Sequence, residues 1–430
     1  MRRIFLHCTA TNEGNFARVP VGVNWTEPKI FSGQYGSWRM IKNIRVSVDQ
    51  KSWTSPPPKY RKAFPFASLP PSSGIDFRRA MLWTGLMSVS PRMPQWWTAS
   101  QWATLRYFGA VDGTVAALRL HSAVDEIDTH PKKVLSDDWG IGIGLEWLDS
   151  QFQYAYVQHG RRVIDELQAL GIANFAGKKK SGPQKCPDFI CTDRNGRYHI
   201  IECKGNQQGP DHTAVQFKQG IMQKANIRFK NEQLVAQRIV AGLAIANYKS
   251  SWGTTLRLTD PPPDSPYDET MAHIQIDTAE PQQILRGLKR AACMQGLLLS
   301  GLFDLARRLL PETSKRRGLD EPNPEFPVTR FETNGSEWMG QEFNLRFPSR
   351  LRINPNETVD GIRLRFGTAA NLIRSINKAS PPNEESLLEE LDLDLVPRRF
   401  SPDGGTHTQA DDRSASIQQG NAFIAVLDFL

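Results

Sequence analysis

The feature that most constrains the fold is the stretch CPDFICTDRNGRYHIIECKG at residues 186–205, where two short apolar runs flank a turn signal. A loop of Arg194, Asn195 and Gly196 suits a type I turn followed by a residue in the left-handed region, and glycine is favoured at that last position. The runs on either side carry apolar residues at successive positions, so both faces of each strand are expected to be buried. The sequence therefore predicts a hairpin inside a sheet whose two faces are covered.

Counting outward from this turn fixes which residues of the two strands face each other. Asp193 pairs with Arg197, and the same register places Asp188 directly opposite Glu202. Their Cβ atoms would be about 4.5–5.5 Å apart, an arrangement that destabilises a sheet when both charges have the same sign. Lys204 follows Glu202 on the same face because side chains alternate along a strand. Two acids and a lysine are therefore expected to converge.

Such a trio suits phosphodiester hydrolysis with a hard divalent cation. Carboxylate oxygens are the ligands that Mg²⁺ prefers, and Mg²⁺ keeps several waters rather than requiring many protein ligands. A bound ion would lower the pKa of a water and neutralise a phosphate, while the ammonium would orient that water or stabilise the developing charge. We expect Mg²⁺ as the cofactor, with Mn²⁺ as a substitute. The competing interpretation is a solvated salt-bridge cluster on a surface hairpin, and the apolar residues on both faces argue against it.

The segments around the hairpin predict a mixed α/β unit. A helix capped by Asp137 or Asp138 contains GIGIGLEWLDSQF, and a second helix, RRVIDELQALG, ends at Gly171. A strand is expected at residues 172–175, before the hairpin. After the hairpin, the sequence predicts an amphipathic helix in TAVQFKQGIMQKANIRFKNEQLVAQ and buried strands in RIVAGLAIA and TTLRLTD.

Shifts in composition divide the chain into three predicted domains. Residues 1–115 are rich in proline and tryptophan without a sustained period, and they are predicted to form a loop-rich domain. Residues 116–260 contain the mixed α/β unit, which ends at TDPPPDSPYDE because consecutive prolines continue neither a helix nor a strand ladder. Residues 261–430 are predicted to hold a helical segment, AEPQQILRGLKRAACMQGLLLSGLFDLARRLL, and an α+β region with alternating runs such as FNLRFPSRLRI.

The central unit resembles the PD-(D/E)xK nuclease superfamily, which has the restriction-endonuclease-like fold: a mixed sheet flanked by helices. A Pro-Asp pair ending at Asp188, followed after a hairpin by Glu202-Cys203-Lys204, is similar to the signature of that family, and the likeness covers roughly residues 130–260. The resemblance implies that Asp188, Glu202 and the main-chain carbonyl of Cys203 bind the metal and that Lys204 assists the attacking water. It also implies a metal-dependent DNA endonuclease of the kind that acts in restriction, phage defence or mobile-element processing.

Two further site residues come from the same resemblance. Many members carry an additional metal-binding acid on the first core helix, and Glu146 in GIGLEWL is matched to it, with Asp149 next. An ordinary solvent-facing helix position is the alternative for Glu146. Exonuclease-like members carry a catalytic glutamine on the helix after the lysine and a tyrosine one turn later. Gln216 occupies the glutamine position, whereas Gly220 stands at the tyrosine position, which puts that subgroup in doubt.

The charge of the chain favours an anionic partner. A formal net charge of +8 and a pI near 9.2 are typical of nucleic-acid-binding proteins, although many basic proteins bind none. Candidate phosphate contacts flank the predicted site and are Lys178, Lys179, Lys180, Lys185 and Lys218. Such a run is equally typical of a solvated face, but beside a phosphodiesterase site it would hold a nucleic-acid backbone, with DNA favoured over RNA.

The remaining composition bears on the compartment and on other partners. Five cysteines argue against a disulfide framework, and the spacing of Cys186, Cys191 and Cys203 is wrong for zinc. No run of about 18 apolar residues could cross a bilayer, so a cytoplasmic protein without a membrane partner is expected. A homo-oligomer and a partner protein are both compatible with the sequence. The alternative function is a catalytically inactive nucleic-acid-binding or assembly protein that retains the nuclease fold.

Overall fold

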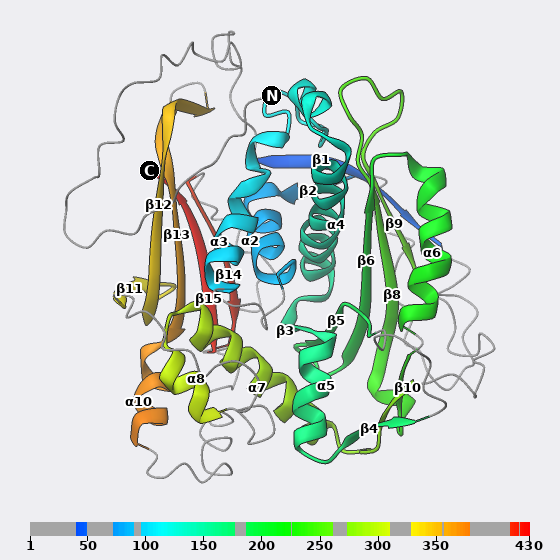
Figure 1. Cartoon of the computed structure of the whole chain (residues 1–430), viewed down its shortest axis with the longest axis vertical. Helices are drawn as coiled ribbons and strands as arrows, with labels where there is room; N and C mark the ends of the chain where they lie inside the picture. The colour runs from blue at the N-terminus through cyan, green and yellow to red at the C-terminus, as the bar shows by residue number, and fades with distance from the viewer. Residues whose placement is uncertain are drawn as a thin grey trace. The chain divides into compact units, whose positions relative to one another are not determined.

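The computed structural model describes ten stretches of the chain, which are residues 40–49, 72–89, 96–176, 186–224, 226–260, 273–309, 328–354, 357–378, 413–420 and 422–430. All of them belong to one compact unit, Gly36–Leu430. The unit is mixed α/β, with a mixed sheet flanked by helices (Figure 1).

The central sheet has seven strands in the order β2-β1-β9-β8-β6-β5-β3. Their bounds are β1 Ile41–Val48, β2 Ser72–Asp76, β3 Tyr154–His159, β5 Phe189–Asp193, β6 Tyr198–Asn206, β8 Val235–Ala244 and β9 Thr255–Thr259. β6 is parallel to β8 and β1 is parallel to β9, whereas the other neighbours are antiparallel. The strands predicted in RIVAGLAIA and TTLRLTD are confirmed as β8 and β9.

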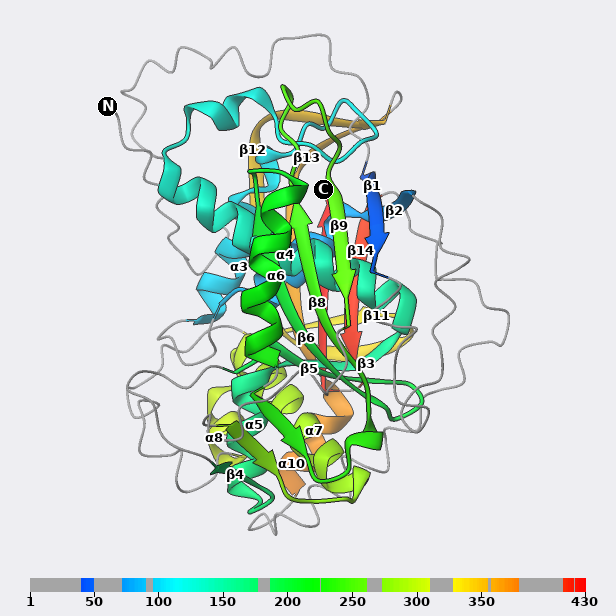
Figure 2. The same cartoon turned by 90° about the vertical axis from the view of Figure 1, so that its right-hand side faces the viewer.

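Helices α4 (Thr129–Phe152) and α6 (Pro210–Lys224) cover opposite faces of this sheet (Figure 1). Glycine lets α4 lie directly on β6, because a Cβ atom at Gly140 would be 2.7 Å from the backbone nitrogen of Gly205. The glycine alternation in GIGIG therefore serves close helix packing. In Figure 2, α6 runs along β8 and β6 on the other face.

The predicted start of α4 was wrong. The helix begins at Thr129 after the N-cap residue Asp128, so Asp137 and Asp138 lie inside it. The amphipathic helix α6 is also shorter than predicted. It ends at Lys224 and is followed by strand β7 (Ile227–Phe229) and a short 3-10 turn.

The first strand of the core was predicted at the wrong place. A strand does form near residues 172–175, as β4 (Ala173–Ala176), but it pairs with β10 (His273–Ile276) in a separate sheet of order β4-β10-β7. The strand beside β5 in the central sheet is β3, which lies between α4 and helix α5 (Gly160–Ala169). Its sequence YAYVQH is short and directly abuts two helical runs, so the pattern did not separate it from them.

The N-terminal region contributes regular elements that its composition did not predict. β1 alternates exposed and buried residues and pairs with both β2 and β9, so it joins the central sheet. Helix α2 (Phe77–Met87), capped by Asp76, packs against α4, and α3 (Trp96–Arg106) packs against α2. The proline-rich stretches at residues 54–71 lie outside the described residues.

The C-terminal region forms a third sheet, which is five-stranded and antiparallel, in the order β11-β12-β13-β15-β14. Its strands are β11 Thr329–Thr333, β12 Ser336–Asn354, β13 Glu357–Ala369, β14 Ser414–Gln419 and β15 Phe423–Phe429. The predicted helical segment is confirmed as a pair, α7 (Pro281–Leu299) and α8 (Phe303–Leu309), separated at Gly301 with φ +76°. A further helix, α10 (Ala370–Lys378), follows β13.

Candidate functional site

The hairpin of β5 and β6 has the register that the sequence predicts. Gly196 has φ +72°, and the amide of Asp193 donates to the carbonyl of Arg197 at 3.0 Å. Thr192 faces Tyr198 and Phe189 faces Ile201, so the next pair outward is Asp188 and Glu202. Because both strands are buried on both faces, this register carries two acids into the interior.

Asp188, Glu202 and Lys204 converge where β5 begins. The backbone amide of Asp188 donates to Glu202 Oε2 at 3.1 Å, and the backbone amide of Cys203 donates to Asp188 Oδ2 at 2.9 Å. Lys204 Nζ forms an ion pair with Glu202 Oε1. The Glu202 side chain is fully buried, whereas 21% of the Lys204 side chain is exposed. The trio is therefore a partly enclosed cluster rather than a solvated one.

The alternation along β6 separates the charged residues from the thiol. The Sγ atom of Cys203 lies on the α4 side, facing Gly144, while Glu202 lies on the α6 side, facing Gly220. The peptide N–H and C=O of one strand residue point to the same side. Since the N–H of Cys203 points to Asp188, its carbonyl oxygen points there as well.

Burial and like charge dominate the electrostatics of this cluster. Burial, followed by the charge of Asp188, raises the pKa of Glu202 to about 8. Burial also raises the pKa of Asp188, which is partly offset by Lys204 and by a side-chain hydrogen bond with Glu202. Burial alone would lower the pKa of Lys204, but the two carboxylates outweigh it and raise that pKa. Each of the two acids therefore holds a proton more readily than an exposed carboxyl group does.

These groups fit a hard divalent cation with few protein ligands. Two carboxyl groups face each other, and the Cys203 carbonyl points to the same side. Within the described ranges no cluster of three or more His, Cys, Asp or Glu side chains is placed to hold a metal. A donor set of two carboxylates and one carbonyl still suits Mg²⁺, which completes its octahedron with water or phosphate oxygens.

No family model, no curated protein and no solved structure matches this chain.

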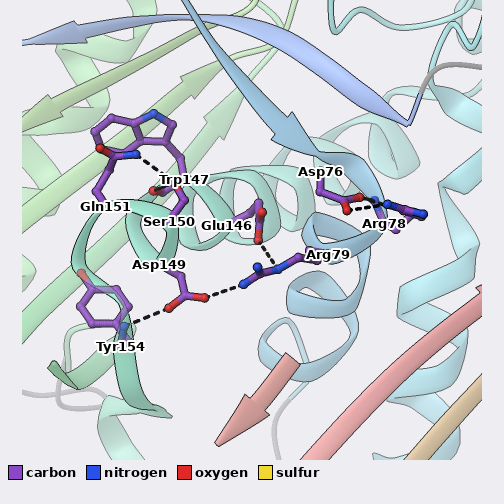
Figure 3. Close-up of polar contacts among 9 residues, drawn as sticks. All are labelled: Asp76, Arg78, Arg79, Glu146, Trp147, Asp149, Ser150, Gln151 and Tyr154. Atoms are coloured by element: carbon purple, nitrogen blue, oxygen red, sulfur yellow. Dashed lines mark hydrogen bonds and ion pairs between the residues drawn. The ribbon is translucent and has the colours of Figure 1, made fainter. Parts of the chain in front are cut away.

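Glu146 forms an ion pair with Arg79 of α2, and no contact among the described residues joins it to the Asp188 cluster, so nothing in the structure supports its predicted place beside the metal. Its Oε2 atom is 3.1 Å from Arg79 Nε, and Arg79 also contacts Asp149 Oδ2 at 2.7 Å. Figure 3 shows Arg79 reaching from α2 between the two acids of α4. The second choice, Asp149, is held in addition by the backbone amide of Tyr154 at 3.0 Å. Both acids face α2, whereas α4 contacts β6 through Gly140 and Gly144.

Asp137 is the acid of α4 whose charge influences the site. The sequence predicts it only as a helix cap. Its charge raises the pKa of Asp188, and it interacts electrostatically with Lys204. Asp137 and Glu146 are separated by about two and a half helical turns and so lie on opposite sides of α4. Ser136, Gly140 and Gly144 are small residues spaced four apart, and they form the side of α4 that faces the sheet. Asp137 directly follows Ser136, so this spacing was the sequence signal that could have placed Asp137 near β6.

Gln216 lies beside the cluster but contacts the strand backbone. Its Nε2 donates to the carbonyl of Gly205 at 3.1 Å, and its Oε1 accepts from Asn206 Nδ2 at 3.2 Å. Both partners directly follow Lys204 on β6. Gln216 thus fixes the end of the strand that carries the lysine.

Of the lysines predicted to contact phosphate, the structure describes only Lys218. Lys218 is exposed on α6. Lys178, Lys179, Lys180 and Lys185 lie outside the described residues.

Proposed function

We propose that this chain is a metal-dependent endonuclease that hydrolyses phosphodiester bonds in DNA and has a restriction-endonuclease-like core. The observation that carries the proposal is the pair of the partly buried Asp188 and the fully buried Glu202, opposed across a hairpin with Lys204 beside it. Two like charges so placed destabilise a sheet unless a cation or a proton separates them. A structural role alone gives no reason for such a pair.

The order of the core elements supports the same proposal. Helix α4 is followed by β3, the hairpin β5–β6, helix α6 and the parallel strand β8. The order is similar to the helix, three strands, helix, strand order of the PD-(D/E)xK superfamily once α5 and β4, and β7 between α6 and β8, are treated as insertions. A role in restriction, phage defence or mobile-element processing would be in keeping with this likeness.

In this mechanism, Asp188, Glu202 and the Cys203 carbonyl would hold Mg²⁺. When bound, the ion would polarise a phosphate oxygen and lower the pKa of a bound water. Glu202 must first lose its proton, since a carboxylate is the ligand form. Lys204, freed in part from Glu202, would donate to the attacking water or to the phosphate as negative charge develops. Asp137 lies close enough to influence both charges and is the α4 acid proposed to support them.

The test is a cleavage assay on supercoiled plasmid and on single-stranded DNA, with Mg²⁺, with Mn²⁺ and with EDTA. Wild type should cut in the presence of either metal, while Asp188→Ala and Lys204→Ala should not. Asp304→Asn is the matched control, because Asp304 is a highly exposed carboxylate on α8. Identical traces from wild type and both site variants would refute the proposal.

A DNA-binding assay distinguishes a nuclease from a protein that binds nucleic acid without cutting it. Lys204→Ala should retain the DNA affinity of the wild type, since its ammonium is proposed to act on the reacting water and phosphate. If wild type binds DNA but no metal supports cutting, the alternative of a non-catalytic nucleic-acid-binding protein replaces the nuclease.

A further inference from the structure

The end of β6 that carries Lys204 has, among the described residues, a neighbouring strand on one side only. β8 pairs with β6 as far as Asn206, whereas β5 pairs with β6 only as far as Ile201. Lysine carries its ammonium on a flexible hydrocarbon stem. The position of the Lys204 ammonium therefore depends on what else holds residues 202–206.

The side chain of Asn206 holds this end of the strand. Its Oδ1 accepts from the backbone amides of Gln208 and Gly209, both at 3.0 Å. Its Nδ2 donates to Thr213 Oγ1 at 2.9 Å and to Gln216 Oε1 at 3.2 Å. A carboxamide has two N–H donors and two oxygen lone pairs, so Asn206, which is 5% exposed, uses its whole hydrogen-bonding capacity.

These bonds fix the orientation of two amide groups. A backbone N–H can only donate, so the Asn206 atom that meets the turn is Oδ1, and Nδ2 faces α6. Gln216 must then accept through Oε1, which directs its Nε2 to the carbonyl of Gly205 at 3.1 Å. Gly205 directly follows Lys204. Asn206 thus joins the turn after β6 and helix α6 to the residue next to the lysine.

Helix α4 holds the same segment from the other face of the sheet. Gln207 Nε2 donates to the carbonyl of Lys132 at 2.9 Å and to Ser136 Oγ at 2.8 Å. A Cβ atom at Gly205 would be 1.7 Å from the carbonyl oxygen of Ser136, so glycine is required where β6 meets α4. Residues 205–207 are therefore held between the two helices that cover the sheet.

We propose that Asn206 is a positioning residue, which holds Lys204 against Glu202 without touching the reacting atoms itself. The three side chains alternate along one face of β6, so a shift at Asn206 is transmitted to Lys204 two residues away. A displacement of about 1 Å near reacting groups can lower a rate about 10²-fold. The effect on catalysis rests on the proposed nuclease function, whereas the effect on the ion pair does not.

A double-mutant cycle in urea, with EDTA present, tests the effect on the ion pair. Lys204→Met should lower the urea midpoint of the wild type. In Asn206→Ala the same substitution should lower it by no more than about half as much, because the ion pair is already weakened. Equal drops in the two backgrounds would overturn the inference.

Gln295→Ala is the matched control for losing a buried carboxamide. Gln295 lies on α7, is 2% exposed and donates to the carbonyl of Leu86 at 3.1 Å. It has no part in the site, so the drop caused by Lys204→Met should be as large in Gln295→Ala as in wild type.

Plasmid cleavage with Mg²⁺ tests the effect on catalysis. Asn206→Ala should lower kcat about 10²-fold and leave KM for DNA within about twofold of the wild type, since it displaces Lys204 rather than a DNA contact. Gln295→Ala should cut at about the wild-type rate. Unchanged kcat in Asn206→Ala would overturn the inference. A wild type that does not cut would instead refute the nuclease proposal, and the urea cycle would then decide whether Asn206 positions Lys204.

A milder pair of variants serves if Asn206→Ala does not fold. Thr213→Val retains the shape of the side chain but removes one acceptor from Asn206 Nδ2, and it should lower kcat about tenfold. Thr213→Ser retains the hydroxyl and should cut within about twofold of the wild type. Equal kcat in the valine and serine variants would overturn the inference.

Discussion

Asp188 and Glu202 at the β5–β6 hairpin, and Glu146 and Asp149 on α4, are both pairs of buried acids beside a single cation. In the α4 pair, each acid has its own nitrogen of Arg79, so the guanidinium separates the two charges (Figure 3). In the hairpin pair, Lys204 contacts only Glu202, and the two carboxyl groups face each other. A raised carboxyl pKa occurs in both places, so the pKa alone does not identify a site.

This difference indicates which pair can accept a metal ion. Arg79 already forms ion pairs with both α4 acids, and a divalent ion would have to displace it. The pKa of each hairpin acid is raised and Lys204 pairs with Glu202 alone, so an ion can take the place of a proton there without displacing an arginine. The predictions that follow probe the two pairs with matched substitutions.

Removing the cation should affect stability much more at the α4 pair. Arg79→Leu leaves two buried acids without a counter-charge and should lower the free energy of unfolding by about 3 kcal/mol. Lys204→Met should lower it by about 1.5 kcal/mol, the contribution of one hydrogen bond to a charged group, because the raised pKa of Glu202 lets that group take up a proton when the ammonium is removed. Urea denaturation of both variants measures the difference. An equal loss would show that the two clusters are equivalent.

Mg²⁺ should stabilise the protein through the hairpin pair only. At pH 8 and a hundredfold excess over its dissociation constant, a specific ligand adds about 2.7 kcal/mol to the free energy of unfolding. We expect the resulting rise in Tm in wild type and in Asp149→Asn, each compared with its own EDTA sample. Asp188→Asn should show no rise. A rise that persists in Asp188→Asn would place the ion elsewhere.

Stability should fall as pH rises from about 4.5 to about 8. A carboxyl group whose pKa is raised in the folded state binds more protons there than in the unfolded chain, so the free energy of unfolding decreases across this window. Glu202→Gln and Glu146→Gln should each make the decrease shallower. Saturating Mg²⁺ should remove only the part of this pH dependence that comes from Glu202. In Glu202→Gln, Mg²⁺ should therefore not change the slope of the free energy of unfolding against pH. Denaturation curves at several pH values, with Mg²⁺ and with EDTA, check this.

The smallest effect is expected at Asp137. Because Asp137 is exposed and influences the site through its charge, Asp137→Asn should lower the cleavage rate about tenfold or less, with little change in stability. Asp138→Asn is the comparison for stability. Asp138 neighbours Asp137 in the sequence but forms an ion pair with Arg106 on α3. An Asp137→Asn rate equal to that of the wild type would remove Asp137 from the site.

The hairpin site was predictable because its signals are local. A glycine in the left-handed region fixes the turn, the turn fixes the register, and the register places Asp188 opposite Glu202. Contacts between distant segments were not predictable in this way. Arg79 meets Glu146 only because α2 packs on α4, and nothing near Glu146 in the sequence signals that helix. The same applies to β1, which enters the sheet beside β9, far along the chain.

The position of the first core strand shows a second limit. Residues 172–175 and β3 are both short, and only residues 172–175 were predicted as a strand, because YAYVQH directly abuts two helical runs. Only strand pairing decides between them, since β3 lies beside β5 whereas β4 pairs with β10. Local periodicity predicts that a strand exists and leaves open which sheet it joins.

The most direct test of the central claim compares Glu202→Gln with Glu146→Gln in plasmid cleavage. The two substitutions are chemically identical and replace buried acids of similar raised pKa. With Mg²⁺ at pH 8, wild type and Glu146→Gln should cut at rates within about threefold of each other, while Glu202→Gln should be slower by about 10³-fold. Cutting by Glu202→Gln at the wild-type rate would contradict the assignment of the site to the hairpin.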